Sequence, residues 1–351
     1  MLIITAIISI GVLIFIHEGG HYLASRAFGV RVTEFMIGLP GPNIGFWRGE
    51  TKFGLTCIPL GGYAKVCGMS SDPLSPHMEA CLGSLYRRGT ATMEEVAADA
   101  NCDDEEAYKC LEELVQWGSA IEPKKTDDYN TYRTPEKRLK DGKMLEEGSA
   151  REIGDRHSFY ESEFNQQYRS KSFIKRCIIL LAGIAMNLLF AMIAFVLIYS
   201  VIGIDYTNAE GNVEHMTVDP LRALQAGCTY IALTVDAILS LFNPATAADT
   251  VSNSTSIVGI AVLSETYFAK GVADALMFMA MISVSLGLMN LLPIPPLDGG
   301  HFIVEIIEKI TRRNIPEKVI GYISTAGVAA MLLFFVVMLN QDIQRFVFGN
   351  W

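Results

Sequence analysis

The segment Gly11–Leu23 reads GVLIFIHEGGHYL and sets two histidines and a glutamate into an otherwise apolar N-terminal run. On a helix, His17 and His21 lie four residues apart and share one face. Two imidazoles on one face can bind one Zn²⁺, and Glu18 beside the first can reach a water on the metal. Ionisable side chains in a membrane helix are costly unless they serve a function. The pattern therefore predicts a metal site, against the simpler interpretation of two histidines packed at a headgroup layer.

The composition indicates an α-helical polytopic membrane protein. Of 351 residues, 50% are hydrophobic and 19% are charged, and this charged share is below the roughly one quarter of a soluble protein. About 20 apolar residues in a helix cross a bilayer core. We expect four transmembrane helices, one that begins at Met1 and three within 178–203, 275–297 and 319–339. A cleaved signal peptide is the alternative for the first run, but no basic residue precedes Leu2.

The net charge and the cysteines exclude two other classes of protein. A net charge of −10 argues against nucleic acid as the main partner, because phosphate binding needs an excess of basic residues. The seven cysteines are odd in number and form no CxxC pair. They are typical of scattered reduced thiols rather than of a disulfide framework.

The distribution of Lys and Arg predicts the orientation in the membrane. The first connection, 26–176, holds 21 of the 28 basic residues, and 301–318 holds four. The connection 204–271 holds only two. Basic residues concentrate in cytoplasmic loops, so we expect both termini outside and the His17–His21 end of the first helix toward the cytoplasm. The expected location is the bacterial plasma membrane.

A third metal ligand is predicted at the end of the third apolar run, where residues 290–301 read NLLPIPPLDGGH. A catalytic zinc takes three protein ligands and keeps one position open. Asp298 ends this run on the cytoplasmic side, at the same depth as His17 and His21. The prolines of this stretch break the helix, which is tolerated where the backbone lines a cavity or a protein surface. The broken stretch can present an edge to an extended substrate.

These residues resemble the site-2 protease family of intramembrane zinc metalloproteases, in its bacterial branch. The resemblance rests on four blocks and one weaker block. The four blocks are His17–His21, Phe28–Val32 leading to Gly38 and Gly41-Pro42, Ile58–Lys65, and Asn290–Gly300. The weaker block is Ala182–Asn187, which lacks the proline that the family usually has after its glycine. Together the blocks cover about two thirds of the chain.

The resemblance implies roles for the residues of these blocks. It implies that His17, His21 and Asp298 bind Zn²⁺ and that Glu18 is the general base. It also implies that residues 32–67 form a membrane-dipping β-hairpin that adds a strand to the substrate; a soluble sheet is the alternative from the pattern alone. Substrate contacts are expected from the turn or edge of this hairpin and from the broken stretch: Gly61, Gly62, Asn290, Pro293 and Pro295.

The chain departs from the family in its outer loop. Many bacterial members carry PDZ domains between the second and third membrane helices, and residues 204–271 are too short for one plus the amphipathic segment 221–242. We expect that segment to lie on the outer surface. A further membrane-spanning helix is the alternative.

Residues 77–136 are predicted to be a cytoplasmic insert of α+β type that resembles a winged-helix domain. Thr92 and Glu95 have capping-box spacing. Three helices and a hairpin are expected, at 78–87, 93–100, 103–117 and 121–133. Winged-helix domains often bind DNA, but this insert contains 14 acidic and 6 basic residues. We therefore expect contact with a protein partner or with a second copy of the chain rather than with nucleic acid.

The sequence predicts four segments and one activity. The segments are 1–76 with the first helix and the hairpin, the insert 77–136, a linker with an amphipathic piece at 137–176, and the remaining membrane core 177–351. The predicted activity is hydrolysis of a peptide bond in or near the membrane helix of single-pass proteins, with anti-sigma factors or signal peptides as implied substrates. A catalytically silent membrane scaffold and a membrane-tethered winged-helix regulator are the alternatives.

Overall fold

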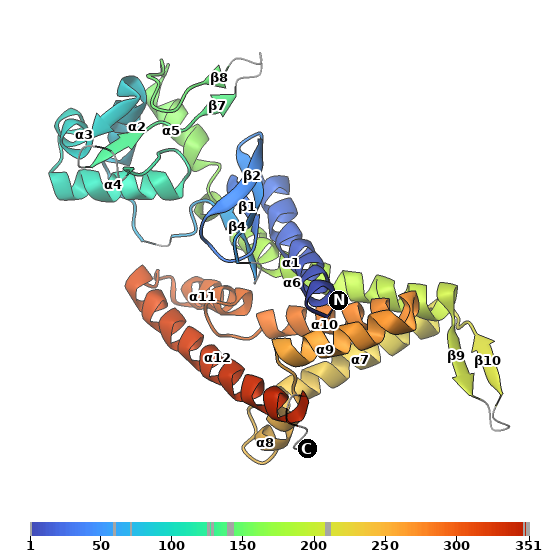
Figure 1. The fold of residues 1–351 in the computed structure, drawn as a ribbon. Coiled ribbons are helices and arrows are strands. Elements are labelled where there is room, and N and C mark those ends of the chain that lie inside the picture. Colours follow the sequence, from blue (N-terminus) through green and yellow to red (C-terminus); the bar gives the residue numbers. More distant parts are fainter. Residues whose placement is uncertain are drawn as a thin grey trace.

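The computed structural model describes residues 2–58, 61–70, 72–124, 127, 130–138, 144–207, 212–346 and 348. It is mainly helical, and three long helices pack together at its centre (Figure 1). They are α1 (Leu2–Ala27), α6 (Phe173–Val196) and α10 (Val272–Asn290). Small residues let helix backbones approach closely in membranes. A side chain on Gly20 of α1 would overlap the backbone oxygen of Ala182 on α6.

Five helices are long and apolar enough to cross a membrane, where the sequence predicts four. The fifth is α7 (Pro220–Ser240), which contains most of the segment that we expect on the outer surface. It packs against α6 and α10, and a side chain on Gly227 would lie 2.8 Å from Met192 Sδ. Only 11% of its most apolar stretch is buried. α7 is thus a peripheral helix whose length and composition also fit a membrane span.

The remaining membrane part surrounds this centre. α6 continues through a π-helical turn, η2 (Leu197–Ile202), into a hairpin of β9 (Ile204–Thr207) and β10 (Val213–Met216). The other helices are α8 (Ala247–Asn253), α9 (Ile257–Lys270), α11 (Asp298–Thr311) and α12 (Glu317–Phe346). Buried Asp342 accepts hydrogen bonds from the backbone N–H groups of Ser256 at 2.6 Å and Gly259 at 3.0 Å. These bonds fix the end of α12 to the start of α9.

Residues 32–66 form a four-stranded mixed sheet beside α1. Its strands are β1 (Val32–Ile37), β2 (Asn43–Arg48), β3 (Thr51–Thr56) and β4 (Gly62–Val66), in the order β2-β3-β1-β4. The predicted hairpin over 32–67 therefore describes only part of the sheet. β2 and β3 are the two strands that follow each other in the chain and also pair, as in a hairpin. β1 pairs with β3 in parallel and with β4 in antiparallel fashion. These pairings join strands that are distant in sequence, and β4 packs on α1.

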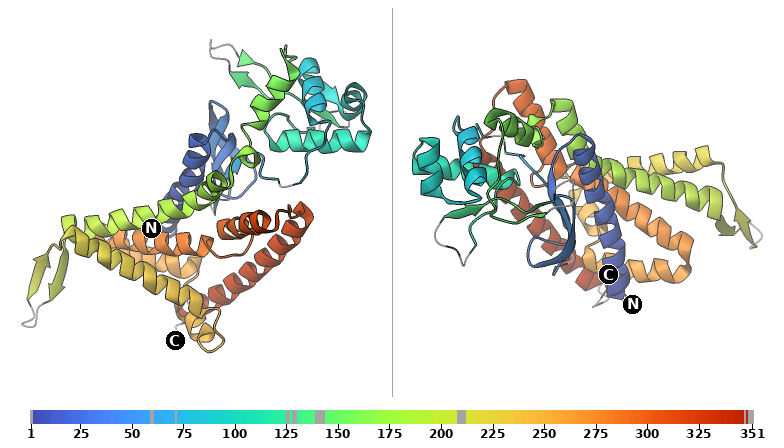
Figure 2. Two further views of the ribbon diagram at one scale, coloured as in Figure 1. Left: turned by 180° about the vertical axis from the view of Figure 1, so that it is seen from behind. Right: turned by 90° about the horizontal axis from the view of Figure 1, so that it is seen from above.

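The segment after the sheet forms a compact unit at the opposite end of the molecule from β9 and β10 (Figure 2). Its first elements are α2 (Met78–Arg88), β5 (Thr90–Thr92), α3 (Met93–Ala100), α4 (Asp104–Gln116) and β6 (Thr131–Arg133). The capping box of Thr92 and Glu95 is confirmed. β5 pairs with β6, and Ile121 bridges to Arg133. Residues 125, 126, 128 and 129 of the expected hairpin lie outside the described ranges.

The core of this unit extends beyond residue 136. Its buried side chains include Leu82, Leu111 and Trp117, and aromatic side chains of α5 (Arg156–Phe164) pack against them. The intervening strands are β7 (Lys137–Arg138) and β8 (Met144–Leu145), which pair with each other. A short 3₁₀ turn, η1 (Tyr168–Ser170), leads from α5 to α6.

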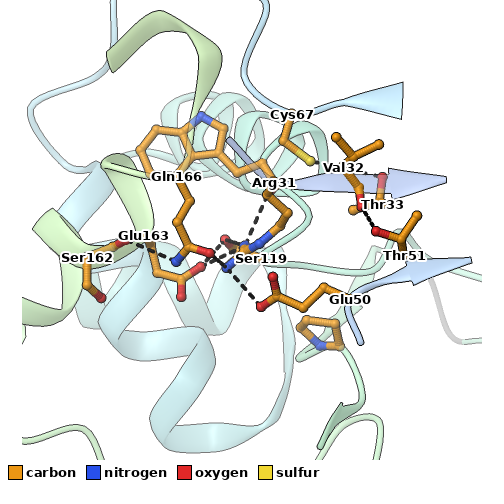
Figure 3. Close-up of polar contacts among 12 residues, drawn as sticks. Arg31, Val32, Thr33, Glu50, Thr51, Cys67, Ser119, Ser162, Glu163 and Gln166 are labelled. Atoms are coloured by element: carbon orange, nitrogen blue, oxygen red, sulfur yellow. Dashed lines mark hydrogen bonds and ion pairs between the residues drawn. The ribbon is translucent and has the colours of Figure 1, made fainter. Parts of the chain in front are cut away.

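A buried ion pair joins this unit to the end of α1 (Figure 3). Arg31 donates to Glu163 Oε2 at 2.8 Å, to Ser119 Oγ at 3.1 Å and to Gln166 Oε1 at 3.0 Å. The side chains of Arg31 and Glu163 are only 5% and 2% exposed. Burial alone would raise the pKa of Glu163, but the Arg31 guanidinium holds that pKa below its ordinary value. Arg31 thus fixes the unit to the sheet and to α1.

We expect Arg31→Met to loosen this junction, because it leaves Glu163 buried without a counter-charge. Removing one partner of a buried pair costs about 3–5 kcal/mol. Amide hydrogen exchange of residues 78–116 should show faster exchange in the variant. The double variant Arg31→Met/Glu163→Leu should recover much of the protection. Lys109→Met, which breaks the exposed pair with Glu105, is the control. Unchanged protection in Arg31→Met would contradict the assignment.

Candidate metal centre

The pentad occupies the third quarter of α1, where the helix meets α6 and the sheet. His17 and His21 are 6% and 8% exposed. Their Nε2 atoms lie 3.3 Å apart, as the i, i+4 spacing predicts. Two imidazole nitrogens therefore converge on one point inside a largely apolar environment.

The third group comes from the opposite end of the chain. Asp298 is the first residue of α11, and its Oδ2 lies 3.0 Å from His17 Nε2 and 3.1 Å from His21 Nε2. The three ligand atoms all lie within 4.8 Å of one another, so the group could hold one metal ion. Two imidazoles and one carboxylate are a donor set that suits Zn²⁺. The structure thus brings together the three residues that the sequence singles out.

An imidazole can bind a metal through Nε2 when its other nitrogen, Nδ1, carries the hydrogen. The partner of Nδ1 therefore shows whether Nε2 is available. His21 Nδ1 lies 2.8 Å from the backbone oxygen of Ile179. A carbonyl oxygen only accepts, so Nδ1 carries the hydrogen and Nε2 presents its lone pair. Metal-binding histidines in proteins are usually oriented by such a bond. The environment of His21 therefore fits a metal ligand.

His17 is oriented by Asn187 on α6, which is fully buried. The amide nitrogen of Asn187 lies 3.2 Å from His17 Nδ1, while its Oδ1 is buried without a hydrogen-bond partner among the described residues. The nitrogen and oxygen of an amide exchange places on a half-turn. After that turn, Oδ1 of Asn187 accepts a hydrogen bond from the Nδ1–H of His17, and His17 Nε2 keeps its lone pair for a metal. In the sequence, Asn187 belongs to the weaker block. Nothing in that block identifies His17, 170 positions earlier, as its partner.

Gly183 makes room for the two histidines. A side chain at this position of α6 would overlap His21 Nε2 and would lie 2.9 Å from His17 Nε2. Any residue larger than glycine would therefore displace the ligand atoms. The sequence signal is again the weaker block, which pairs this glycine with Asn187 four residues later on the same face of α6.

Glu18 lies where β4 crosses α1. A side chain on Gly62 would approach Glu18 Cγ at 3.2 Å, and the Glu18 carboxyl is close to the backbone of Ala64. Glu18 is therefore beside the edge strand of the sheet and adjacent to His17. Gly61 precedes this strand with a φ of 90°, a left-handed conformation that favours glycine.

The broken stretch after α10 forms the link to Asp298. α10 ends at Asn290, and the loop through Pro293 and Pro295 leads directly into α11. Glycines close this loop: a side chain on Gly299 would overlap Leu291 O, and one on Gly327 of α12 would overlap Pro295 O. In the described part of the chain, no hydrogen bond joins Asn290 to the three converging residues. The loop is thus held next to the centre by its packing.

The chain is similar in sequence to a peptidase family and to several bacterial proteases. A model of peptidase family M50 matches residues 5–334. A protein of Clostridium acetobutylicum whose name describes a zinc metalloprotease is 25% identical to this chain, over 97% of each chain. The protease Eep of Enterococcus faecalis is 24% identical over 99% of each chain, and the regulator of sigma-W protease RasP of Bacillus subtilis is 23% identical over 98% of each chain.

Asn187→Leu is expected to weaken zinc binding, because it removes the group that orients His17. Loss of such an orienting partner typically costs about 10–100-fold in metal affinity. Competition with a chelator, on the detergent-solubilised chain, measures the affinity. Ser285→Ala is the control, because the Ser285 hydroxyl donates to Met281 O of its own helix and, in the described part of the chain, makes no hydrogen bond to the three converging residues. Equal affinities for Asn187→Leu and the unchanged chain would show that Asn187 does not orient the ligand.

Proposed function

The chain belongs to peptidase family M50, and we propose that it hydrolyses a peptide bond in or near the membrane helix of single-pass proteins. It is an integral membrane zinc metalloprotease. The observation that carries the proposal is the convergence of two imidazoles and a carboxylate, with a glutamate beside them, within a helix long and apolar enough to cross a membrane. A soluble substrate would not require a catalytic centre in such a helix.

We assign His17, His21 and Asp298 as the zinc ligands and Glu18 as the general base. Bound zinc supplies Lewis-acid chemistry, which polarises a carbonyl and acidifies water. Glu18 accepts the proton of the attacking water and later donates it to the leaving amine. Asn187 and the Ile179 carbonyl hold the imidazoles in orientation throughout. The close contact with α6 excludes bulk water from the buried side of the ligands.

The substrate is proposed to bind as a strand along β4. A membrane helix keeps its carbonyls in internal hydrogen bonds, so it must unwind before a peptide bond is accessible. β4 is an edge strand and passes over Glu18 at Gly62. Pairing with this edge replaces the hydrogen bonds that the unwound substrate loses. Gly61 and Gly62 keep the edge free of bulk.

The other edge of the sheet supports its placement in the membrane surface. Ile44, Phe46 and Trp47 of β2 are 85%, 64% and 63% exposed. Exposed aromatic and aliphatic side chains of this kind are typical of a membrane-interface contact. We therefore propose that the sheet dips into the lipid at β2 and offers β4 to the substrate. Asn290, Pro293 and Pro295 are proposed to contact the substrate from the opposite side.

The basic residues support a cytoplasmic location of the centre. The connection 26–176 is rich in Lys and Arg, and α1 reaches it immediately after the pentad. We propose the bacterial plasma membrane, with both termini outside and with α7 lying on the outer surface, so that four of the five candidate helices cross. The name of RasP describes a regulator of sigma-W protease. We propose membrane-anchored regulators of sigma factors, together with signal peptides, as the substrates of this chain.

The cytoplasmic unit is proposed to be a winged-helix-like domain that contacts protein. The order α2-β5-α3-α4-β6 and the pairing of β5 with β6 support this assignment. Its α4 would be the recognition helix, but it begins with Asp104, Glu105 and Glu106. Acidic residues there repel phosphate, which disfavours a DNA-binding regulator. The protein that contacts this domain is proposed to be the substrate or a second copy of the chain.

Glu18→Gln is expected to retain zinc and to cut a single-pass model substrate at least 100-fold more slowly, the lower range for general acid–base catalysis. The variant and the unchanged chain should be compared in detergent for zinc content and cleavage. Glu94→Gln, at an exposed position of α3, is the control and should cut normally. If Glu18→Gln holds zinc and cuts normally, the assigned base is wrong. If neither chain cuts although the substrate can unwind, the scaffold alternative is favoured.

A further inference from the structure

A second polar cavity, of about 690 Å³, lies between the start of α6 and the end of α11. Four basic residues contribute to its lining, together with one carboxylate. The basic residues are Arg169, Arg176, Lys309 and Arg312, and the carboxylate is Glu308. None of the proposed zinc ligands lines this cavity. It is therefore a separate site of positive charge.

Two of the four cations are already paired with carboxylates. Arg169 lies 3.1 Å from Glu113, and Arg176 lies 3.0 Å from Glu305. Arg176 Nε is nevertheless buried without a hydrogen-bond partner among the described residues. This nitrogen is closed off from solvent, so Arg176 contributes positive charge to the wall of the cavity rather than a donor to its interior.

The other two cations have no carboxylate within ion-pair distance in the described part of the chain. Lys309 lies over the ring of Phe173, with Nζ 5.7 Å from the centroid. Arg312 ends α11 in a left-handed conformation and is exposed. Glu308, whose Oε1 accepts the backbone N–H of Ile315 at 2.8 Å, is the single carboxylate in the lining and cannot balance both cations. An anion of compact charge would complete this arrangement.

The position of α11 places the cavity at the membrane surface. Ile303, Ile307 and Ile310 are 37%, 42% and 76% exposed, and their spacing puts them on one face of α11. On the opposite face, Glu305 and Glu308 are buried. A helix with an exposed apolar face and basic residues at its end lies in the plane of the interface. In the proposed orientation, such a position of α11 puts the cavity at the level of the lipid headgroups, on the side rich in basic residues.

We propose that this cavity binds a phosphate group, supplied by the headgroup of an anionic phospholipid. Lys309 and Arg312 are its donors, and Arg169 and Arg176 add positive charge to the wall. The effect of this lipid on cleavage rests on the proposed function, because α11 begins with Asp298, one of the proposed zinc ligands. A headgroup held between α11 and the start of α6 fixes the helix that carries Asp298 against the helix that carries Asn187. Anionic lipid would then promote cleavage without contacting the substrate.

Lipid binding can be measured without activity, on the Glu18→Gln chain. Mass spectrometry of the intact protein in detergent counts retained phosphatidylglycerol against phosphatidylcholine. Preferential retention of phosphatidylglycerol is expected. Each cation near an anionic headgroup contributes roughly a fivefold change in binding, so Lys309→Gln/Arg312→Gln should weaken retention by about 25-fold. The charge-preserving variant Lys309→Arg/Arg312→Lys should retain the lipid, as should the control Arg87→Gln/Lys109→Gln in the cytoplasmic unit.

Free phosphate is distinguished in a second arm. Inorganic phosphate is titrated at constant ionic strength, and the thermal unfolding midpoint is recorded for the same chains. A rise that the double glutamine variant lacks, without selective retention of phosphatidylglycerol, would overturn the lipid as the source and keep the phosphate chemistry. If neither anion distinguishes the double glutamine variant from its parent chain, the proposal is wrong.

The consequence for activity is tested in vesicles with the catalytic chain. Cleavage should be faster in mixed vesicles of phosphatidylcholine and phosphatidylglycerol than in phosphatidylcholine alone, and the double glutamine variant should lose this difference. A chain that binds phosphatidylglycerol but cuts nothing in any vesicle contradicts the proposed function and leaves the binding site standing. A chain that cuts equally in both vesicles contradicts the regulatory consequence.

Discussion

The close approach of α6 to α1 is the constraint on which the centre depends. Gly20 and Gly183 remove the side chains that would separate the two backbones. In their place, α6 supplies the Ile179 carbonyl and the Asn187 amide that orient the two imidazoles. Helices in lipid gain little from the hydrophobic effect, so close packing and polar contacts hold them together. The same contact therefore stabilises the helix pair and positions the proposed metal ligands.

Much of the centre was predictable from the sequence because its signals are local. The spacing of His17 and His21 follows from helix geometry, and Asp298 follows from a broken apolar run on the same side of the membrane. A polar side chain within an apolar run, such as Asn187, is expected to bond across helices or to face the site, but its partner His17 could not be identified from the sequence. The sheet was underestimated for the same reason: its parallel β1–β3 pairing joins strands that no turn connects.

The unit that follows the sheet shows the same division between local and distant information. Its capping box could be predicted from Thr92 and Glu95 alone. Its attachment could not, because the partner of Arg31 is Glu163, 132 positions later in the chain. That ion pair and the cavity at the end of α11 both lie on elements that continue directly from the centre.

We propose that His17, His21 and Asp298 together hold zinc. X-ray absorption at the zinc edge, on the purified chain in detergent, tests this assignment. We expect two imidazole nitrogens and carboxylate oxygen at about 2.0–2.2 Å, with no sulfur. Asp298→Ala should lose one oxygen ligand and keep both imidazoles. A zinc with sulfur at about 2.3 Å, or a spectrum unchanged by Asp298→Ala, would contradict the account.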